Sequence, residues 1–168
     1  MDAAILPVEL KGLERGHLRL MRIEAGMAAL VLVIALFVLR LTLWPYLVEE
    51  GVARPWMQLV AVPALAIALW QLTLAPARRF AAWGYALAAD ELHVAHGVWT
   101  QVHTIVPLTR VQHIDIAQGP IERLCGIVRL VVHTAGTEHA VVELPGITRA
   151  AAEAMRDSIR AHVRAEPW

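Results

Sequence analysis

Two long apolar runs occupy most of residues 23–75 and limit what this chain can fold into. The first, Ile23–Trp44, contains only Glu24 and Arg40 as charged residues, and the second, Pro55–Ala75, contains none. At about 1.5 Å per residue, about 22 helical residues extend roughly 33 Å, enough to cross the hydrocarbon core of a bilayer. The first run is too long for a cleaved signal peptide and has a mostly polar segment before it. We therefore predict an α-helical membrane hairpin.

Basic residues near the ends of these runs predict the orientation of the hairpin. Arg22 and three earlier basic residues precede the first run, and Arg78 and Arg79 follow the second, whereas the connecting loop holds Glu49, Glu50 and only Arg54. Basic residues stay on the cytoplasmic side, so both termini are expected there, in a multi-pass protein of the inner cell membrane. Aromatic residues near both ends favour the same assignment, because such residues gather at membrane interfaces. They are Trp44, Tyr46 and Trp56 outside, and Phe80, Trp83 and Tyr85 inside.

The expected organisation has five parts. A cytoplasmic N-terminal segment is followed by the first span, an outer loop, the second span and a cytoplasmic domain. Their bounds are 1–22, 23–48, 49–54, 55–76 and 77–168. The stretch Leu10–Arg22 places several apolar residues near one helical face. It is either an amphipathic helix on the membrane surface or an inner extension of the first span.

Composition excludes several classes of partner and site. The chain has 15 basic and 15 acidic residues, whereas a nucleic-acid binder needs clustered Lys and Arg for phosphate contacts. We therefore expect no nucleic-acid partner. Cys125 is the only cysteine, which excludes an internal disulfide and a thiolate zinc cluster.

The C-terminal part changes to short alternating segments, which predict β-strands. Val111–Gln118, for example, puts Ile114 and Ile116 on one face and His113 and Asp115 on the other. Further strands are expected near 92–96, 99–106, 126–134 and 140–144, with a turn at Gly119-Pro120. Thr148 is a suitable N-cap for a final amphipathic helix. The fold class is thus a membrane helical hairpin plus a mainly-β barrel or sandwich that this helix plugs.

The run VPLTRVQHIDIAQGPIERLCGIVRLVVHTAG, residues 106–136, resembles the YdbS-like family of bacterial membrane proteins. The segments W.YAL..DEL.V..G at 83–97 and LPG at 144–146 match as well, and the resemblance extends from about residue 20 to the end. It implies a bacterial pleckstrin-homology-like (PH-like) domain of two nearly orthogonal antiparallel sheets capped by the final helix. Larger relatives with repeated copies of the domain often accompany such proteins, so the resemblance also implies a membrane complex.

Candidate chemistry is sparse. Pleckstrin-homology domains that hold inositol phosphates use basic residues at their first hairpin. Here the corresponding turn is the acidic Ala88-Ala89-Asp90-Glu91, which removes the main reason to predict a phosphoinositide site. His93 and His96, three apart on a strand, point to opposite faces, and zinc needs three or four convergent ligands. We expect exposed strand histidines, no metal and no cofactor. Ser158 and Cys125 lack the surroundings of a nucleophile, so we expect no enzyme.

The polar string between residues 110 and 123 exceeds what strand packing requires. Asp115 and Glu122 are expected to pair with Arg110, Arg123 or Arg129 and to fix the long turn. The candidate interaction surface comprises Arg110, Gln112, His113, Asp115, Gln118, Glu122 and Arg123.

The expected function is a non-enzymatic membrane scaffold whose PH-like domain binds another protein at the inner face of the membrane. The expected partners are the lipid bilayer and another membrane protein or related PH-like subunit, in a homo- or hetero-oligomer. Two alternatives stay open at this point: a membrane-bound enzyme that uses surface His and Asp residues, and a module that senses anionic lipid.

Overall fold

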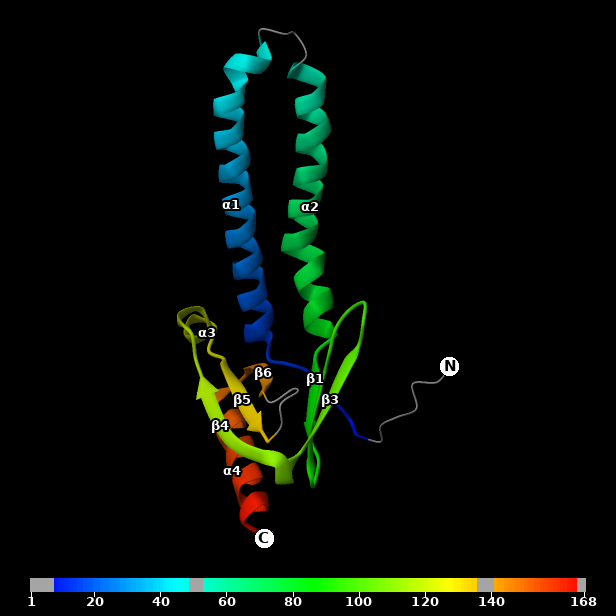
Figure 1. Cartoon of the computed structure of the whole chain (residues 1–168), viewed down its shortest axis with the longest axis vertical. Coiled ribbons are helices and arrows are strands. Elements are labelled where there is room, and N and C mark those ends of the chain that lie inside the picture. The colour runs from blue at the N-terminus through cyan, green and yellow to red at the C-terminus, as the bar shows by residue number, and fades with distance from the viewer. Residues whose placement is uncertain (1–7, 49–52, 136–140, 166–168) are drawn as a thin grey trace, which may run out of the picture. The chain divides into compact units, whose positions relative to one another are not determined.

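The structure is a computed structural model that describes residues 8–48, 53–135 and 141–165. Side chains are described for residues 8–42, 62–135 and 141–162. The side chains of the expected outer aromatic residues, Trp44, Tyr46 and Trp56, lie outside these ranges. The chain divides into two compact units, and Figure 1 labels most elements of both. Unit 1 comprises Met1–Leu20 and Arg78–Trp168, and unit 2 comprises Met21–Ala77.

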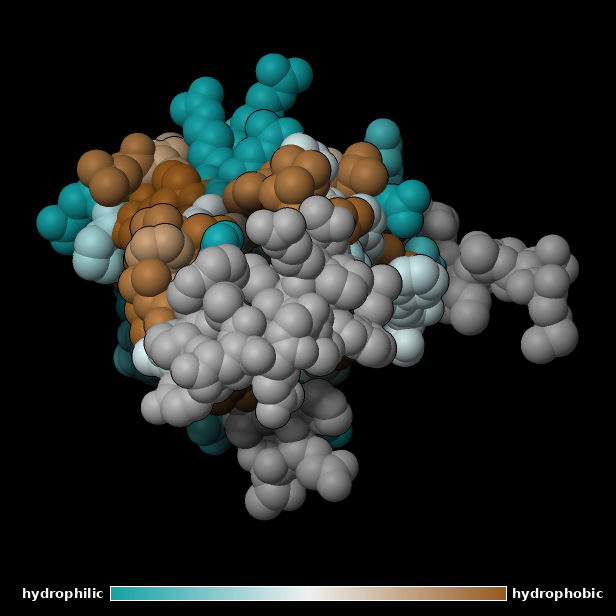
Figure 2. All heavy atoms as spheres, turned by 90° about the horizontal axis from the view of Figure 1, so that it is seen from above, coloured by the Kyte–Doolittle hydropathy of each residue, from teal (hydrophilic) through white to brown (hydrophobic). Residues whose placement is uncertain are grey.

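Two long helices supply the described part of unit 2. Helix α1 spans Arg15–Val48 and α2 spans Ala53–Ala81, so each extends beyond its apolar run into unit 1. Within the described residues, α1 is the one helix long and apolar enough to cross a membrane. Its large apolar side chains are exposed, for example Leu30, Val31 and Phe37, and Figure 2 shows exposed hydrophobic residues in brown. Such an apolar surface is stabilised by hydrocarbon and is costly in water.

The described residues of unit 1 after α2 form two three-stranded antiparallel sheets and three short or medium helical segments (Figure 1). The first sheet has the order β1-β2-β3 and the second the order β4-β5-β6. The strands are β1 (Gly84–Leu87), β2 (Glu91–His96), β3 (Val102–Pro107), β4 (Val111–Ala117), β5 (Val128–Thr134) and β6 (Val141–Ile147). The helical segments are the 3-10 turn η1 (Leu108–Arg110), α3 (Pro120–Leu124) and α4 (Arg149–Ala165).

The inward-facing residues of both sheets and of α4 form one hydrophobic core. In β5, Val128, Leu130 and Val132 are fully buried, as the alternating pattern predicts for one face of a strand. Leu92 and Val94 from β2 join the same core. Helix α4 adds an apolar stripe at helical spacing, namely Ala152, Met155 and Ile159.

The start of α4 confirms the predicted cap. The backbone N–H of Ala151 donates a hydrogen bond of 3.1 Å to the Thr148 hydroxyl. This satisfies one of the first-turn N–H groups that have no partner within the helix. By contrast, the expected turn at Gly119-Pro120 is the start of α3, where Pro120 takes the first helical position.

The N-terminal segment is an integral part of unit 1. Lys11 exchanges two backbone hydrogen bonds with Tyr85 in β1, 2.8 and 2.9 Å long, and the Glu14 N–H donates to the Gly146 carbonyl. Leu13, His17 and Leu20 are buried. Of the two readings of Leu10–Arg22, the structure supports the inner extension of the first span from Arg15 onward, because α1 is continuous over Arg15–Val48. The apolar face of this segment packs against protein.

The expected inner aromatic residues have a different environment from the one predicted. Tyr85 is buried in the core, and Phe80 and Trp83 pack against it. The physical reason is that β1 begins directly after α2, at Gly84, and so brings these rings into the fold of unit 1.

Candidate interaction surface

Strand β4 carries four of the predicted site residues on or just before it. Arg110, Gln112, His113 and Asp115 are all exposed, and β4 lies at an edge of its sheet. The pairing register with β5 shifts between Val111 and His113, which makes Gln112 a bulge position. A bulge redirects side chains and interrupts the ladder, and here it leaves Gln112 and His113 exposed in succession.

Asp115 links two histidines on the exposed face of β4 and β5. Its Oδ1 lies 2.7 Å from His113 Nε2, and its Oδ2 lies 3.4 Å from His133 Nε2. His113 and His133 are cross-strand partners with ring centroids 5.8 Å apart. The side chain of His113 is 65% exposed, that of Asp115 is 52% exposed and that of His133 is 38% exposed. Ion pairs this exposed contribute only about 0–1 kcal/mol, so stability does not explain the cluster.

Metal binding finds no support in this cluster. Among the side chains that the structure describes, no group of three or more His, Cys, Asp or Glu is arranged to hold a metal ion. His113 Nε2 and His133 Nε2 both lie against the Asp115 carboxylate. We describe this set as a polar surface cluster.

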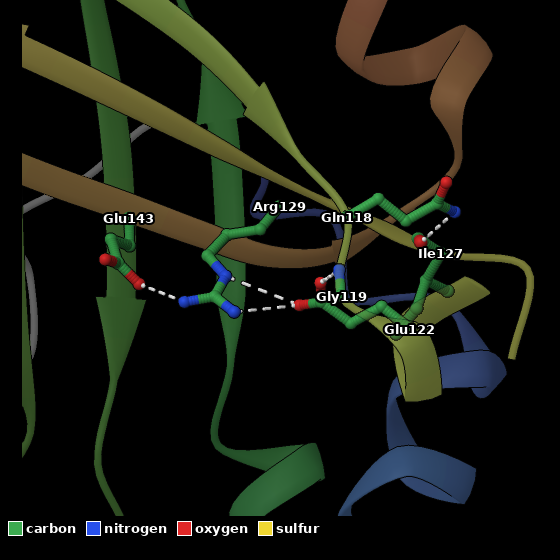
Figure 3. Close-up of polar contacts among 6 residues, drawn as sticks. All are labelled: Gln118, Gly119, Glu122, Ile127, Arg129 and Glu143. Atoms are coloured by element: carbon green, nitrogen blue, oxygen red, sulfur yellow. Dashed lines mark hydrogen bonds and ion pairs between the residues drawn. The ribbon is translucent and has the colours of Figure 1, made fainter. Parts of the chain in front are cut away.

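Glu122 corrects the predicted surface, because its side chain is buried. It is 5% exposed and accepts hydrogen bonds from the Gly119 N–H and from Arg129 Nε and Nη2, the latter two at 3.3 and 3.1 Å (Figure 3). Arg129 also donates to Glu143 Oε2 at 3.1 Å. The hydrogen bond to Glu143 raises the pKa of Arg129 above its ordinary value. Partial burial opposes this shift, and the charge of Glu122 adds to it. The expected Glu122–Arg129 pairing is thus confirmed, but Asp115 pairs with histidines instead of arginines.

Gln118 also braces the chain between β4 and β5. Its Nε2 donates to the Ile127 carbonyl at 2.8 Å (Figure 3). Its Oε1 accepts from Arg149 Nη2 at 3.2 Å. Gln118 and Glu122 therefore hold α3 and its flanking turns in place, which explains two positions of the polar string in structural terms. Arg123 stays exposed on α3. The predicted surface accordingly separates into exposed residues on β4 and internal braces after it.

Two histidines that the sequence did not single out as buried lie in the interior. His93 is 3% exposed, so the expectation of exposed strand histidines is wrong at this position. Its ring stacks on His103 with centroids 5.5 Å apart, and its Nε2 lies 3.5 Å from Glu91 Oε2. The signal was available, because His93 stands between Leu92 and Val94 at the start of a strand buried on both faces.

His17 lies in the part of α1 that belongs to unit 1, before the apolar run begins. It is 5% exposed and meets Trp83 edge to face at 6.4 Å between centroids. Neither ring nitrogen has a hydrogen-bond partner among the residues that the structure describes. Burial lowers the pKa of His17 below 6.5, with Glu122 opposing this and Arg129 adding to it. Its spacing from Leu13 and Leu20 placed it on an apolar helical face, which was the sequence signal for burial.

Comparisons with known proteins agree with this architecture. A model of the bacterial PH domain family matches residues 5–163. The chain is 30% identical over 142 residues to the UPF0699 transmembrane protein YdbS of Bacillus subtilis, which covers 84% of this chain and 82% of that protein. No solved structure matches the chain significantly. The two sheets, the closing helix α4 and the apolar helix α1 are the parts expected of such a protein. The chain therefore belongs to the bacterial PH domain family, and within it to the YdbS-like transmembrane proteins.

Proposed function

We propose that this protein is a non-enzymatic membrane scaffold whose PH-like domain binds another PH-like chain at the inner face of the membrane. The contact uses the β4 surface, which we define as Arg110, Gln112, His113, Asp115 and His133. Helices α1 and α2 form a two-span hairpin with both termini in the cytoplasm, as the basic residues at their inner ends favour.

The observation that carries this proposal is the exposed His113–Asp115–His133 cluster on an edge strand. Its charges contribute little to folding because solvent screens them, so a partner is the simplest reason for their arrangement. Covering such a cluster with a partner would remove this screening and strengthen each hydrogen bond. The bulge at Gln112 interrupts the edge ladder, which favours recognition through side chains over the addition of a strand.

Site-specific photo-crosslinking in native membranes tests the proposal. The full chain carries a benzophenone amino acid at Gln112, and a matched chain carries it at Arg160, an exposed position on α4. We expect a light-dependent adduct from position 112 that mass spectrometry identifies as a second copy or another PH-like protein. Position 160 should give much less of this adduct.

A double substitution provides the specificity control. His113→Ala with Asp115→Ala should abolish the adduct from position 112, while the thermal unfolding of the chain changes little, because both side chains are exposed. Equal adduct yields at positions 112 and 160, or an adduct unaffected by the double substitution, would contradict the proposed surface.

A further inference from the structure

Trp99 and Leu124 are unusually exposed for large apolar side chains. They are 89% and 85% exposed, and no other large apolar side chain described in unit 1 exceeds 48%. Trp99 lies in the connection between β2 and β3, with Val98 (39% exposed) beside it, and Leu124 ends the short helix α3. Exposed apolar residues concentrated at loop tips commonly mark a surface that contacts a partner or a membrane.

The loop with Trp99 lies at the end of unit 1 where the chain enters from α2. Strand β1 starts at Gly84, directly after α2, and Gly84 pairs with Ala95 near the end of β2. The Trp83 ring packs on the His96 ring, with centroids 4.8 Å apart. The connection 97–101 therefore extends from the strand ends that are closest to the last turn of α2.

Leu124 lies beside the other connection of unit 1, the start of α1. A Cβ added to Gly16 would lie 2.6 Å from the Cys125 carbonyl oxygen and 2.5 Å from Ile127 Cγ2. The backbone after Leu124 thus touches the first turn of α1. Both exposed apolar side chains consequently lie next to the two points at which unit 1 continues into long helices.

The same end of unit 1 carries exposed positive charge. Arg19 in the first turns of α1, Arg78 and Arg79 in the last turn of α2, and Arg123 next to Leu124 are all exposed. A bilayer interface favours this combination, because Trp rings prefer the headgroup region and arginines are attracted to anionic headgroups.

We propose that Trp99 and Leu124 insert into the headgroup region of the bilayer that α1 crosses, and so hold unit 1 against the membrane surface. This inference rests on the membrane insertion of α1 and is independent of the β4 surface. The occupant is lipid, recognised by its apolar boundary and its anionic headgroups. Contact at two separate loops would restrict the rotation of the domain about its helix connections.

Depth-dependent fluorescence quenching in nanodiscs tests the inference with the full chain. Cys125, the single cysteine, is first replaced by alanine. The unfolding temperature of this Cys125→Ala chain is compared with that of the parent chain. An environment-sensitive dye is then attached to Trp99→Cys, Leu124→Cys or Asp157→Cys. Asp157 is an exposed position on α4 and serves as the control. The nanodiscs contain phosphatidylcholine and phosphatidylglycerol, with a spin label near the headgroup of some lipids.

We expect the dyes at positions 99 and 124 to be quenched several-fold more by spin-labelled lipid than the dye at 157, and less by aqueous iodide. Equal quenching at all three positions would overturn the proposal. A second result would also overturn it: iodide cannot reach the dye at position 99 in native membranes, yet spin-labelled lipid does not quench that dye in nanodiscs. A protein would then be the occupant.

Changing the lipid charge distinguishes insertion of the apolar side chains from electrostatic attraction alone. In nanodiscs of phosphatidylcholine only, quenching at 99 and 124 should weaken but persist, because insertion of the rings and methyl groups needs no charge. Complete loss of quenching would overturn insertion and leave only electrostatic attraction. The photo-crosslink at Gln112 should be obtained whichever result this experiment gives, so the two proposals fail separately.

Discussion

His17 packs directly over Gly146, so that the first turns of α1 and the end of β6 are in van der Waals contact. A Cβ built on Gly146 would lie 2.5 Å from His17 Cβ, and Gly146 has a φ of +71°. Only glycine combines this left-handed backbone conformation with so close an approach. The contact gives a structural role to the LPG segment, which the sequence resemblance had marked without a reason.

Gly146→Ala should destabilise unit 1 by about 2 kcal/mol or more, because a left-handed φ and a steric clash each cost about 1–3 kcal/mol. Thermal unfolding of the full chain in detergent micelles measures the effect. Gly12→Ala is the matched control, since its Cβ would meet nothing within 4 Å. Adding His17→Ala to Gly146→Ala should restore only the part of the loss that comes from His17 Cγ and Nδ1, which would lie 2.5 and 2.9 Å from the added Cβ, because the Cβ at position 17 remains. Strict additivity of the two substitutions would argue against the contact.

Glu122→Ala should cost about 1–3 kcal/mol, because the Gly119 N–H and Arg129 lose a shared acceptor in a buried position. Glu143→Ala removes the other partner of Arg129 at a side chain that is 51% exposed, and should cost less than about 1 kcal/mol. Glu122→Gln keeps an acceptor for the Gly119 N–H, so its loss of stability should lie between those of Glu122→Ala and Glu143→Ala. Chemical denaturation of the three variants compares them. Similar losses for Glu122→Ala and Glu143→Ala would show that Glu122 is not the central brace.

Leu13→Ala should destabilise unit 1 by about 2–5 kcal/mol, as deletion of a buried leucine side chain generally does. It should also speed hydrogen exchange at the Tyr85 amide, which donates to the Lys11 carbonyl. Leu124→Ala is the control, because its side chain is 85% exposed. If exchange at Tyr85 is unchanged by Leu13→Ala, the N-terminal segment does not stabilise β1.

The stability of unit 1 should fall as the pH drops below 6.5. The pKa of His17 is lowered in the folded state, so the unfolded chain takes up the proton first. The contribution of neutral His17 is therefore complete above its unfolded pKa of 6.5 and is lost as the pH falls toward its lower folded pKa. Glu122 and Arg129 face this ring with opposite effects. His17→Leu should reduce the slope of unfolding temperature against pH. An unchanged slope in His17→Leu would refute this assignment.

Periodicity alone predicted the elements whose burial depends on local spacing. The length and apolarity of residues 23–44 predicted a helix that can cross a membrane, and α1 has these properties. Alternation along β4 placed His113 and Asp115 on one exposed face, and Thr148 caps α4 as predicted. These features follow from the chain's own geometry, because helix and strand periods fix which side chains share a face.

Only the tertiary structure decided which polar residues are internal. Glu122 and Asp115 look alike in sequence, as acidic residues near arginines in a polar string, yet one is buried and the other exposed. The difference arises because Arg129 and Gly119 converge on Glu122 only once β5 pairs with β4. The burial of His17 likewise depends on Gly146 from the far end of the chain. Sequence spacing reports faces, whereas contacts between distant segments depend on how those faces are assembled.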